Sequence, residues 1–141
     1  MSKKSWIGGI YLKEEGGYQI ISKSLVHYKK RLQTIHASPE LKEAAAMFAP
    51  ILQSTAKKRI PLIDETKEKI EKFLIGSTTS EFLEKDIEIL EKSLECRKSD
   101  IEKAENTSDE YFLKLLKDLE EAKKDVIPIN YALKKIKEYS E

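Results

Sequence analysis

The stretch FLKLLKDLEEAKKDVIPINYALKKI, residues 112–136, decides the fold class because its apolar residues recur at alternating spacings of three and four. This spacing puts them on one face of a helix: Phe112, Leu115, Leu119, Ala122, Val126, Ile129, Leu133 and Ile136. Such a seam is typical of helices that pack as in a coiled coil. The pattern keeps its phase past Pro128, so we expect one helix kinked at this residue, with a break there as the alternative.

A second amphipathic stretch precedes this one, and the two predict an antiparallel helical hairpin over residues 78–141. Its apolar residues are Leu83, Ile87, Leu90, Leu94 and Ile101. Thr78 followed by Glu81 and Thr107 followed by Glu110 both have the pattern of a capping box, which marks a helix start. Each arm would be roughly 40 Å long at the usual rise of a helix, so we expect an elongated body.

The seam of the second stretch has a flaw in ECRKSD, residues 95–100. Between Leu94 and Ile101 the position expected to be apolar falls on Arg97 or Lys98. One interpretation is that the tip of an exposed hairpin needs little core, with Cys96 a small surface or half-buried residue. The other is that the charged tip is a contact surface.

Residues 18–75 contain further helical patterns with basic, then mixed, charge. The first helix is expected over residues 18–36, with one apolar face formed by Ile21, Leu25, Tyr28, Leu32 and Ile35. Ser38 is a good N-cap for a second helix, in which Pro50 predicts a kink. A third helix is expected over residues 62–75, stopped by a glycine.

The N-terminal segment WIGGIYLKEEGGYQII, residues 6–21, differs from the rest and holds four of the five glycines. Its β-branched and aromatic residues on either side of KEEGG predict a short hairpin. The alternative is a flexible arm, residues 1–17, that orders on a partner. As a hairpin, the segment would pack Trp6, Ile10, Tyr11 and Leu12 on the helices behind it. As an arm, it makes Trp6, Ile10 and Tyr11 the candidates for contact with a partner.

The chain of 141 residues has the length of one domain, with 36% charged and 40% hydrophobic residues. We therefore predict a single all-α domain, residues 1–141: an elongated antiparallel bundle of five or six helices with a short N-terminal β-hairpin or arm. The lone Cys96, the lack of a secretion signal and the absence of an apolar run of roughly 20 residues predict a cytoplasmic protein without a membrane span.

The sequence contains no recognisable catalytic or cofactor motif. Neither His27 nor His36 follows a glutamate at the spacing of a Glu-x-x-His metal motif, and with a single cysteine a conventional zinc site is not expected. No phosphate-binding glycine loop is found, and no histidine lies near Cys96 in the sequence. We expect no enzymatic activity, cofactor or metal, although a Mg²⁺ site made only of carboxylates stays open.

Charge is distributed unevenly along the chain, with a balance of +7 over residues 1–61 and −6 over residues 62–141. Basic residues on the first two helices could hold phosphates if the fold brings them together; they are Lys23, His27, Lys30, Lys57, Lys58 and Arg59. The alternative is that the two halves of one bundle attract each other, and that lysines near a helix C-terminus favour its dipole.

These patterns favour a non-enzymatic intracellular helical module or subunit of an assembly, which contacts a protein partner through an exposed helix face or the N-terminal arm. Self-association is a second expectation, because amphipathic hairpins bury leftover apolar surface in dimers. The alternative function is a nucleic-acid-associated protein that uses the basic first two helices. The sequence specifies neither the partner nor the biological process.

Overall fold

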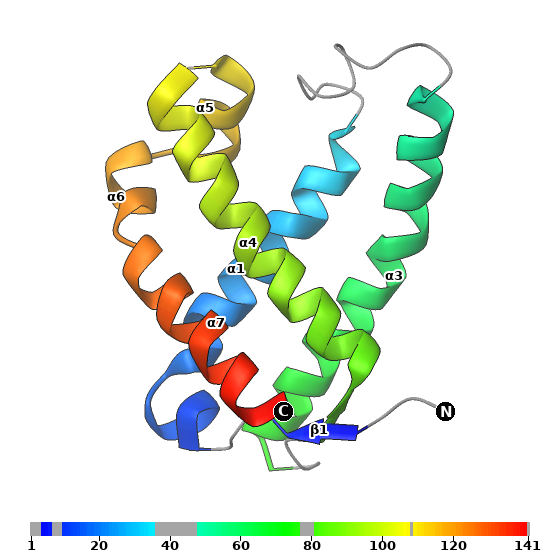
Figure 1. Cartoon of the computed structure of the whole chain (residues 1–141), viewed down its shortest axis with the longest axis vertical. Helices are drawn as coiled ribbons and strands as arrows, with labels where there is room; N and C mark the ends of the chain where they lie inside the picture. Colours follow the sequence, from blue (N-terminus) through cyan, green and yellow to red (C-terminus); the bar gives the residue numbers. More distant parts are fainter. Residues whose placement is uncertain (1–3, 7–9, 36–47, 77–80, 108, 141) are drawn as a thin grey trace.

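The computed structural model describes residues 4–6, 10–35, 48–76, 81–107 and 109–140 (Figure 1). Most of these residues are helical, so the predicted helical class is confirmed. The elements in chain order are β1 (Lys4–Trp6), the π-helical turn η1 (Ile10–Glu14), α1 (Gly17–Gln33), α3 (Ala49–Leu74), β2 (Glu81–Leu83), α4 (Glu84–Thr107), α5 (Glu110–Leu116), α6 (Leu119–Lys123) and α7 (Val126–Ser140).

Helix α1 is the centre of the bundle. It contacts α3, α4 and α7, and it crosses behind α4 in the view of Figure 1. Helix α3 lies on one side of this crossing, while α5, α6 and α7 lie on the other and return along α4. Because α1 has neighbours on several sides, it buries more than the single apolar face that its sequence predicts.

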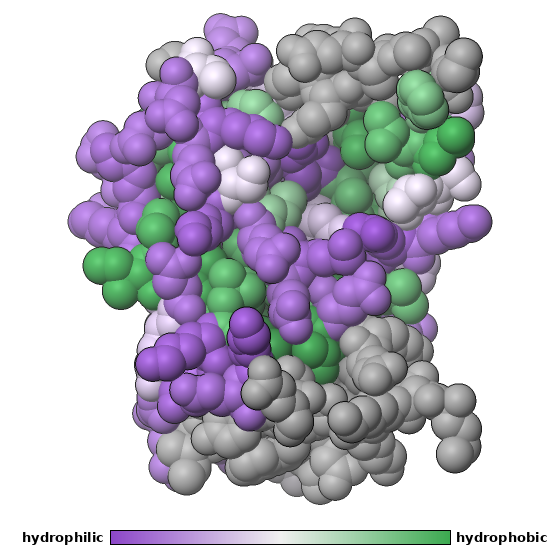
Figure 2. All heavy atoms as spheres, in the orientation of Figure 1, coloured by the Kyte–Doolittle hydropathy of each residue, from purple (hydrophilic) through white to green (hydrophobic). Residues whose placement is uncertain are grey.

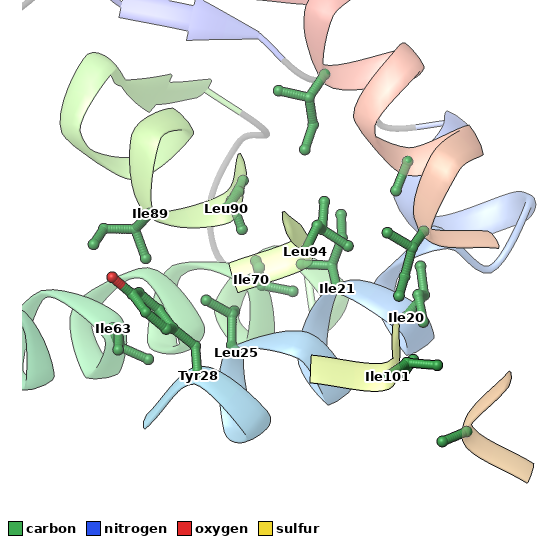
Figure 3. Close-up of a cluster of buried hydrophobic side chains, with 14 of the residues drawn as sticks. Ile20, Ile21, Leu25, Tyr28, Ile63, Ile70, Ile89, Leu90, Leu94 and Ile101 are labelled. Carbon is green, nitrogen blue, oxygen red and sulfur yellow. The ribbon is translucent and has the colours of Figure 1, made fainter. Parts of the chain in front are cut away.

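The apolar core lies where α1 meets α3 and α4. Figure 3 shows Ile21 and Leu25 of α1 close to Ile70 of α3 and Leu94 of α4. These four side chains are at most 1% exposed, and burial of each stabilises the fold by about 1.5–3 kcal/mol. No described helix is long and apolar enough to cross a membrane.

The return arm after α4 is three helices, so the prediction of one helix kinked at Pro128 is wrong. The chain breaks first at Lys117, whose φ of 66° lies outside the helical region. Asp118 then accepts a hydrogen bond from the Glu121 amide at 3.2 Å and caps α6. Pro128 falls in the first turn of α7, where its missing N–H removes no bond within the helix. The predicted seam still faces inward, since Phe112, Ala122, Ile129 and Ile136 are buried.

The two predicted capping boxes are not observed as such. Helix α5 is capped by Asp109, whose carboxylate accepts from the Tyr111 amide at 2.9 Å, while the Thr107 hydroxyl bonds backward to the Lys103 carbonyl. Thr78 lies outside the described residues, and Glu81 belongs to strand β2. A carboxylate one residue from the helix start serves the same orphan amides as the predicted threonine would.

Helix α3 replaces the two helices predicted over this part of the chain. The predicted kink at Pro50 is wrong, because Pro50 stands in the first turn of α3, where its ring removes no hydrogen bond within the helix. Pro61 lies inside the helix. The helix continues through Pro61 because its apolar residues, such as Ala56, Ile63 and Ile70, stay buried on both sides of the proline. The predicted cap Ser38 lies outside the described residues.

The N-terminal hairpin predicted within residues 6–21 is not observed. Strand β1 pairs instead with the distant β2, antiparallel, with Trp6 opposite Glu81. The second half of the proposed hairpin is the start of α1, and Gly16 with φ of 78° makes the left-handed turn before that helix. The side chains of Trp6, Ile10 and Tyr11 lie outside the described residues, so their role as partner contacts stays a prediction.

Candidate functional site

A groove with basic edges runs between α1 and α3. It consists of two hollows of about 340 and 480 Å³, both of which are lined by Gln33. Apart from Gln53, the remaining lining residues are apolar or lysine: Leu25, Val26, Lys29, Lys30, Leu32, Ile35, Ala56, Lys57, Ile60, Ile63 and Lys67. We refer to this surface as the basic groove.

The basic groove combines exposed apolar surface with cations. Val26 is 49% exposed. Lys29 pairs with Asp64 at 2.7 Å, but Lys30, Lys57 and Lys67 join no ion pair within the described part of the chain. The groove therefore offers an apolar floor under a rim of uncompensated positive charge.

On the opposite side of α1 lies a buried polar network. Helix spacing brings its members together, since His27 and Arg31 are four residues apart on α1 and Arg97 and Asp100 are three apart on α4. All of these side chains are nearly inaccessible to solvent. The network also includes Lys23, Cys96, Tyr111 and Asp125.

His27 is the centre of the buried polar network. Its Nε2 lies 2.8 Å from Asp100 Oδ2, and Arg97 Nη1 lies 3.1 Å from its Nδ1. Because a guanidinium can only donate, Nδ1 must accept, and this assigns the proton to Nε2, which donates to Asp100. The hydrogen bonds thus define a neutral imidazole in one tautomer.

Two arginine–aspartate pairs extend from this histidine. Arg97 donates to Asp125 Oδ2 from Nε at 3.1 Å and from Nη2 at 2.9 Å, and Lys23 Nζ approaches the same oxygen at 3.0 Å. On the other side, Arg31 Nε donates to Asp100 at 3.1 Å. The network consequently ties α1 to α4 and to the junction between α6 and α7.

Burial shifts the pKa values of two groups at the centre of the network, the His27 imidazole and the Cys96 thiol. Burial lowers the pKa of His27, and the charges of Arg97 and Arg31 lower it further, against the opposing effect of Asp100. Burial also raises the pKa of the Cys96 thiol, with Asp100 adding to the rise. The thiol is therefore protonated at neutral pH, which makes it a poor nucleophile.

Ligand atoms of His27, Cys96 and Asp100 lie within 4.8 Å of one another, a grouping that sequence spacing did not predict. Zinc accepts such ligands, but here they are arranged around a shared proton. A metal on Nε2 would move that proton to Nδ1, which faces a donor of Arg97. Arg31 and Arg97 also add two positive charges beside the cation, so the arrangement fits a hydrogen-bonded network better than a metal site.

The structure separates the six predicted phosphate contacts. Lys30 and Lys57 line the basic groove, whereas Lys58 is exposed but lines neither of its hollows. Lys23 and His27 belong to the buried polar network. Arg59 donates to the Tyr28 hydroxyl at 2.7 Å. Of these residues, His27 is only 4% exposed, so a phosphate cannot reach it in this conformation.

Sequence reasoning missed several residues of both regions. Lys67 follows Ile60 and Ile63 on one face of α3, and this spacing could have revealed it. Arg97 was noticed only as a flaw in the apolar seam. It lies in the middle of α4 and is buried, so the interpretation of a hairpin tip that needs little core is wrong.

The buried histidine predicts that stability declines in mild acid. The folded state holds His27 neutral, so the unfolded chain binds its proton first as the pH falls below the ordinary pKa of 6.5. The contribution of neutral His27 to the free energy of unfolding is therefore complete above this pH. It is lost as the pH falls toward the lowered pKa of His27 in the folded state. We expect the urea midpoint to fall between pH 7.5 and 5 less steeply in His27→Gln, whose amide keeps a donor and an acceptor. Equal slopes for both proteins would contradict the assignment.

Comparisons with known proteins add no family. No family model matches the chain, and neither a curated protein nor a solved structure matches it. A functional proposal therefore depends on the geometry of the basic groove and of the buried polar network.

Proposed function

We propose that this protein is a non-enzymatic helical interaction module, and that the basic groove binds an acidic amphipathic helix of a protein partner. The observation that carries the proposal is the half-exposed Val26, which shares one hollow with Lys30 and Lys67, while Lys57 lines the other hollow. None of these three lysines joins an ion pair in the described chain. Apolar surface attracts the apolar stripe of a partner helix, and the lysines attract the carboxylates that flank it.

The shape of the basic groove supports a helical occupant. Two packed helices, α1 and α3, form its walls, and its accessible apolar lining consists of Val26 in one hollow and the partly buried Leu32 and Ile60 in the other. A helix presents apolar side chains at spacings of three and four, so successive side chains of one stripe can enter the two hollows. Gln33, between the hollows, can bond to a polar side chain of the partner.

Nucleic acid is the second candidate, and the lysines alone would also suit it. The apolar floor argues against this occupant, since phosphates and sugars gain nothing from contact with Val26. No aromatic side chain that could stack on a base lines the two hollows among the described residues. A net charge of +1 for the whole chain adds little general attraction for a polyanion.

The chemistry of the buried polar network supports a non-enzymatic role. Its thiol is protonated, and its carboxylates are engaged by arginine and histidine. The network joins helices, which is a structural task. We also propose an intracellular location, because the single, half-buried cysteine has no second thiol to pair with.

The test is fluorescence anisotropy with three labelled probes: an amphipathic helical peptide with glutamates flanking a leucine stripe, the same peptide with glutamines in place of the glutamates, and duplex DNA. We expect the acidic peptide to bind most tightly. Reversing Lys30, Lys57 and Lys67 to Glu should weaken this binding by at least about tenfold. Val26→Gln should weaken it too, at unchanged net charge.

The matched control is reversal of Lys114, Lys117 and Lys134, three exposed lysines outside the basic groove that give the same change in net charge. We expect this control to bind the acidic peptide as the wild type does. DNA binding that is lost on lysine reversal but insensitive to Val26→Gln would favour the second candidate. Equal effects of the groove and control variants would sink the proposal.

A further inference from the structure

A second groove, with a different character, lies between the start of α1 and the start of α7. Its volume is about 590 Å³, and Ile20, Ile127, Pro128 and Tyr131 form much of its lining. Ile127 is 80% exposed and Tyr131 is 39% exposed. Figure 2 shows hydrophobic surface at the left edge, where α6 leads into α7. We call this surface the α1–α7 groove.

The polar groups of the α1–α7 groove make contacts within the chain, although the charged side chains of Lys23 and Glu15 stay exposed. Lys23 pairs with Asp125 at 3.0 Å, and the Tyr131 hydroxyl donates to Glu15 at 2.9 Å. A partner would therefore meet mainly apolar surface, and little polar surface would lose water without compensation. Burial of the exposed Ile127 side chain by a partner would give the largest gain in hydrophobic free energy on this surface.

The charges around the α1–α7 groove indicate which partner fits. The amine of Lys23 lies on one part of its lining and the carboxylate of Glu15 on another, so the surface carries both signs. A twofold axis brings a patch against its own copy, and a patch with both signs can then place opposite charges together. The basic groove carries one sign and would repel itself.

We propose that the α1–α7 groove is a twofold interface with a second copy of this chain. In such a dimer, Ile127 of each copy enters the hollow of the other, next to Ile20 and Pro128. Lys23 of one copy faces Glu15 of the other. The self-association expected from the sequence thus acquires a defined surface, independent of the basic groove.

Sedimentation velocity tests this interface. We expect a reversible monomer–dimer equilibrium with a dissociation constant on the order of micromolar, as is common for small interfaces. Ile127→Glu should leave a monomer at all concentrations up to about 1 mM, a loss of at least about a thousandfold in affinity. The control is Ile75→Glu, because Ile75 is also 80% exposed but lies at the end of α3 outside the groove.

A charge exchange distinguishes this dimer from unspecific association. Lys23→Glu alone and Glu15→Lys alone should each weaken self-association, since both create like charges across the axis. Mixing the two variants should restore dimers, because the introduced carboxylate of one meets the introduced amine of the other. Circular dichroism of each variant checks that it is folded. A wild-type monomer at about 1 mM, or a dimer insensitive to Ile127→Glu, would overturn the proposal.

Discussion

Asp100→Ala is expected to lower the free energy of unfolding by about 3–5 kcal/mol, the usual cost of removing one partner from a buried charge pair. The Asp100 carboxylate is 2% exposed and accepts from both His27 and Arg31. Without it, the imidazole N–H loses its acceptor, and Arg31 and Arg97 are left beside each other with less compensating charge. Urea unfolding followed by circular dichroism at pH 7.5 measures the change.

The exposed pair of Lys29 and Asp64 provides the matched control. Its distance is 2.7 Å, shorter than the bonds of Asp100 to either partner, but the Asp64 side chain is 50% exposed. Solvent screens such a pair, so Asp64→Ala should change stability by less than about 1 kcal/mol. Asp100→Asn, which keeps an acceptor of the same shape, should fall between the two. Similar losses for Asp64→Ala and Asp100→Ala would show that the buried polar network contributes no more than a surface contact.

Helices and their buried faces could be predicted from the sequence because apolar spacing is a local property. Ile21 and Leu25 of α1, Leu94 of α4 and Ile129 of α7 were all assigned to inward faces, and all are buried. The buried face was predicted correctly even where one predicted helix is three helices, α5, α6 and α7. The spacing of apolar residues defines a face whether or not the backbone is continuous. The breaks at Lys117 and Asp118 depend on a cap and a backbone turn that the periodicity does not record.

Long-range pairing could not be predicted in the same way. Strand β1, of sequence KSW, has only its tryptophan in common with a typical strand, and its partner β2 lies more than 70 residues later in the chain. Nothing in the short segment EFL distinguishes it from the first turn of the helix that follows. The predicted hairpin paired the first segment with the nearest strand-like segment in the sequence. The actual partner is distant in the sequence, so this prediction was wrong.

The candidate sites were predicted only in part, for a related reason. Lys30 and Lys57, predicted as phosphate contacts, do line one groove, but His27, predicted as a contact of the same kind, is buried. A charged residue looks alike in sequence whether it faces solvent or a buried partner. Arg97 was detectable as an exception to the apolar seam, whereas its partner Asp125 had no such signal.

Arg97→Leu is expected to destabilise the protein, although it removes the charged exception from the apolar seam. The substitution completes the apolar seam between Leu94 and Ile101, so the periodicity alone predicts a gain in stability. The structure predicts the opposite. Asp125 would lose the two hydrogen bonds from Arg97 while remaining mostly buried, and His27 Nδ1 would lose its donor. We expect a loss of about 3–5 kcal/mol in urea unfolding.

Removing both charges separates the two explanations. In Arg97→Leu with Asp125→Leu no buried carboxylate is left without its guanidinium, and Lys23, whose side chain is 53% exposed, can be solvated. The double variant should therefore recover at least about half of the stability lost by Arg97→Leu alone, a coupling that a double-mutant cycle measures directly. Additive losses would mean that Arg97 stabilises the bundle through its packing, and that the pair with Asp125 is incidental.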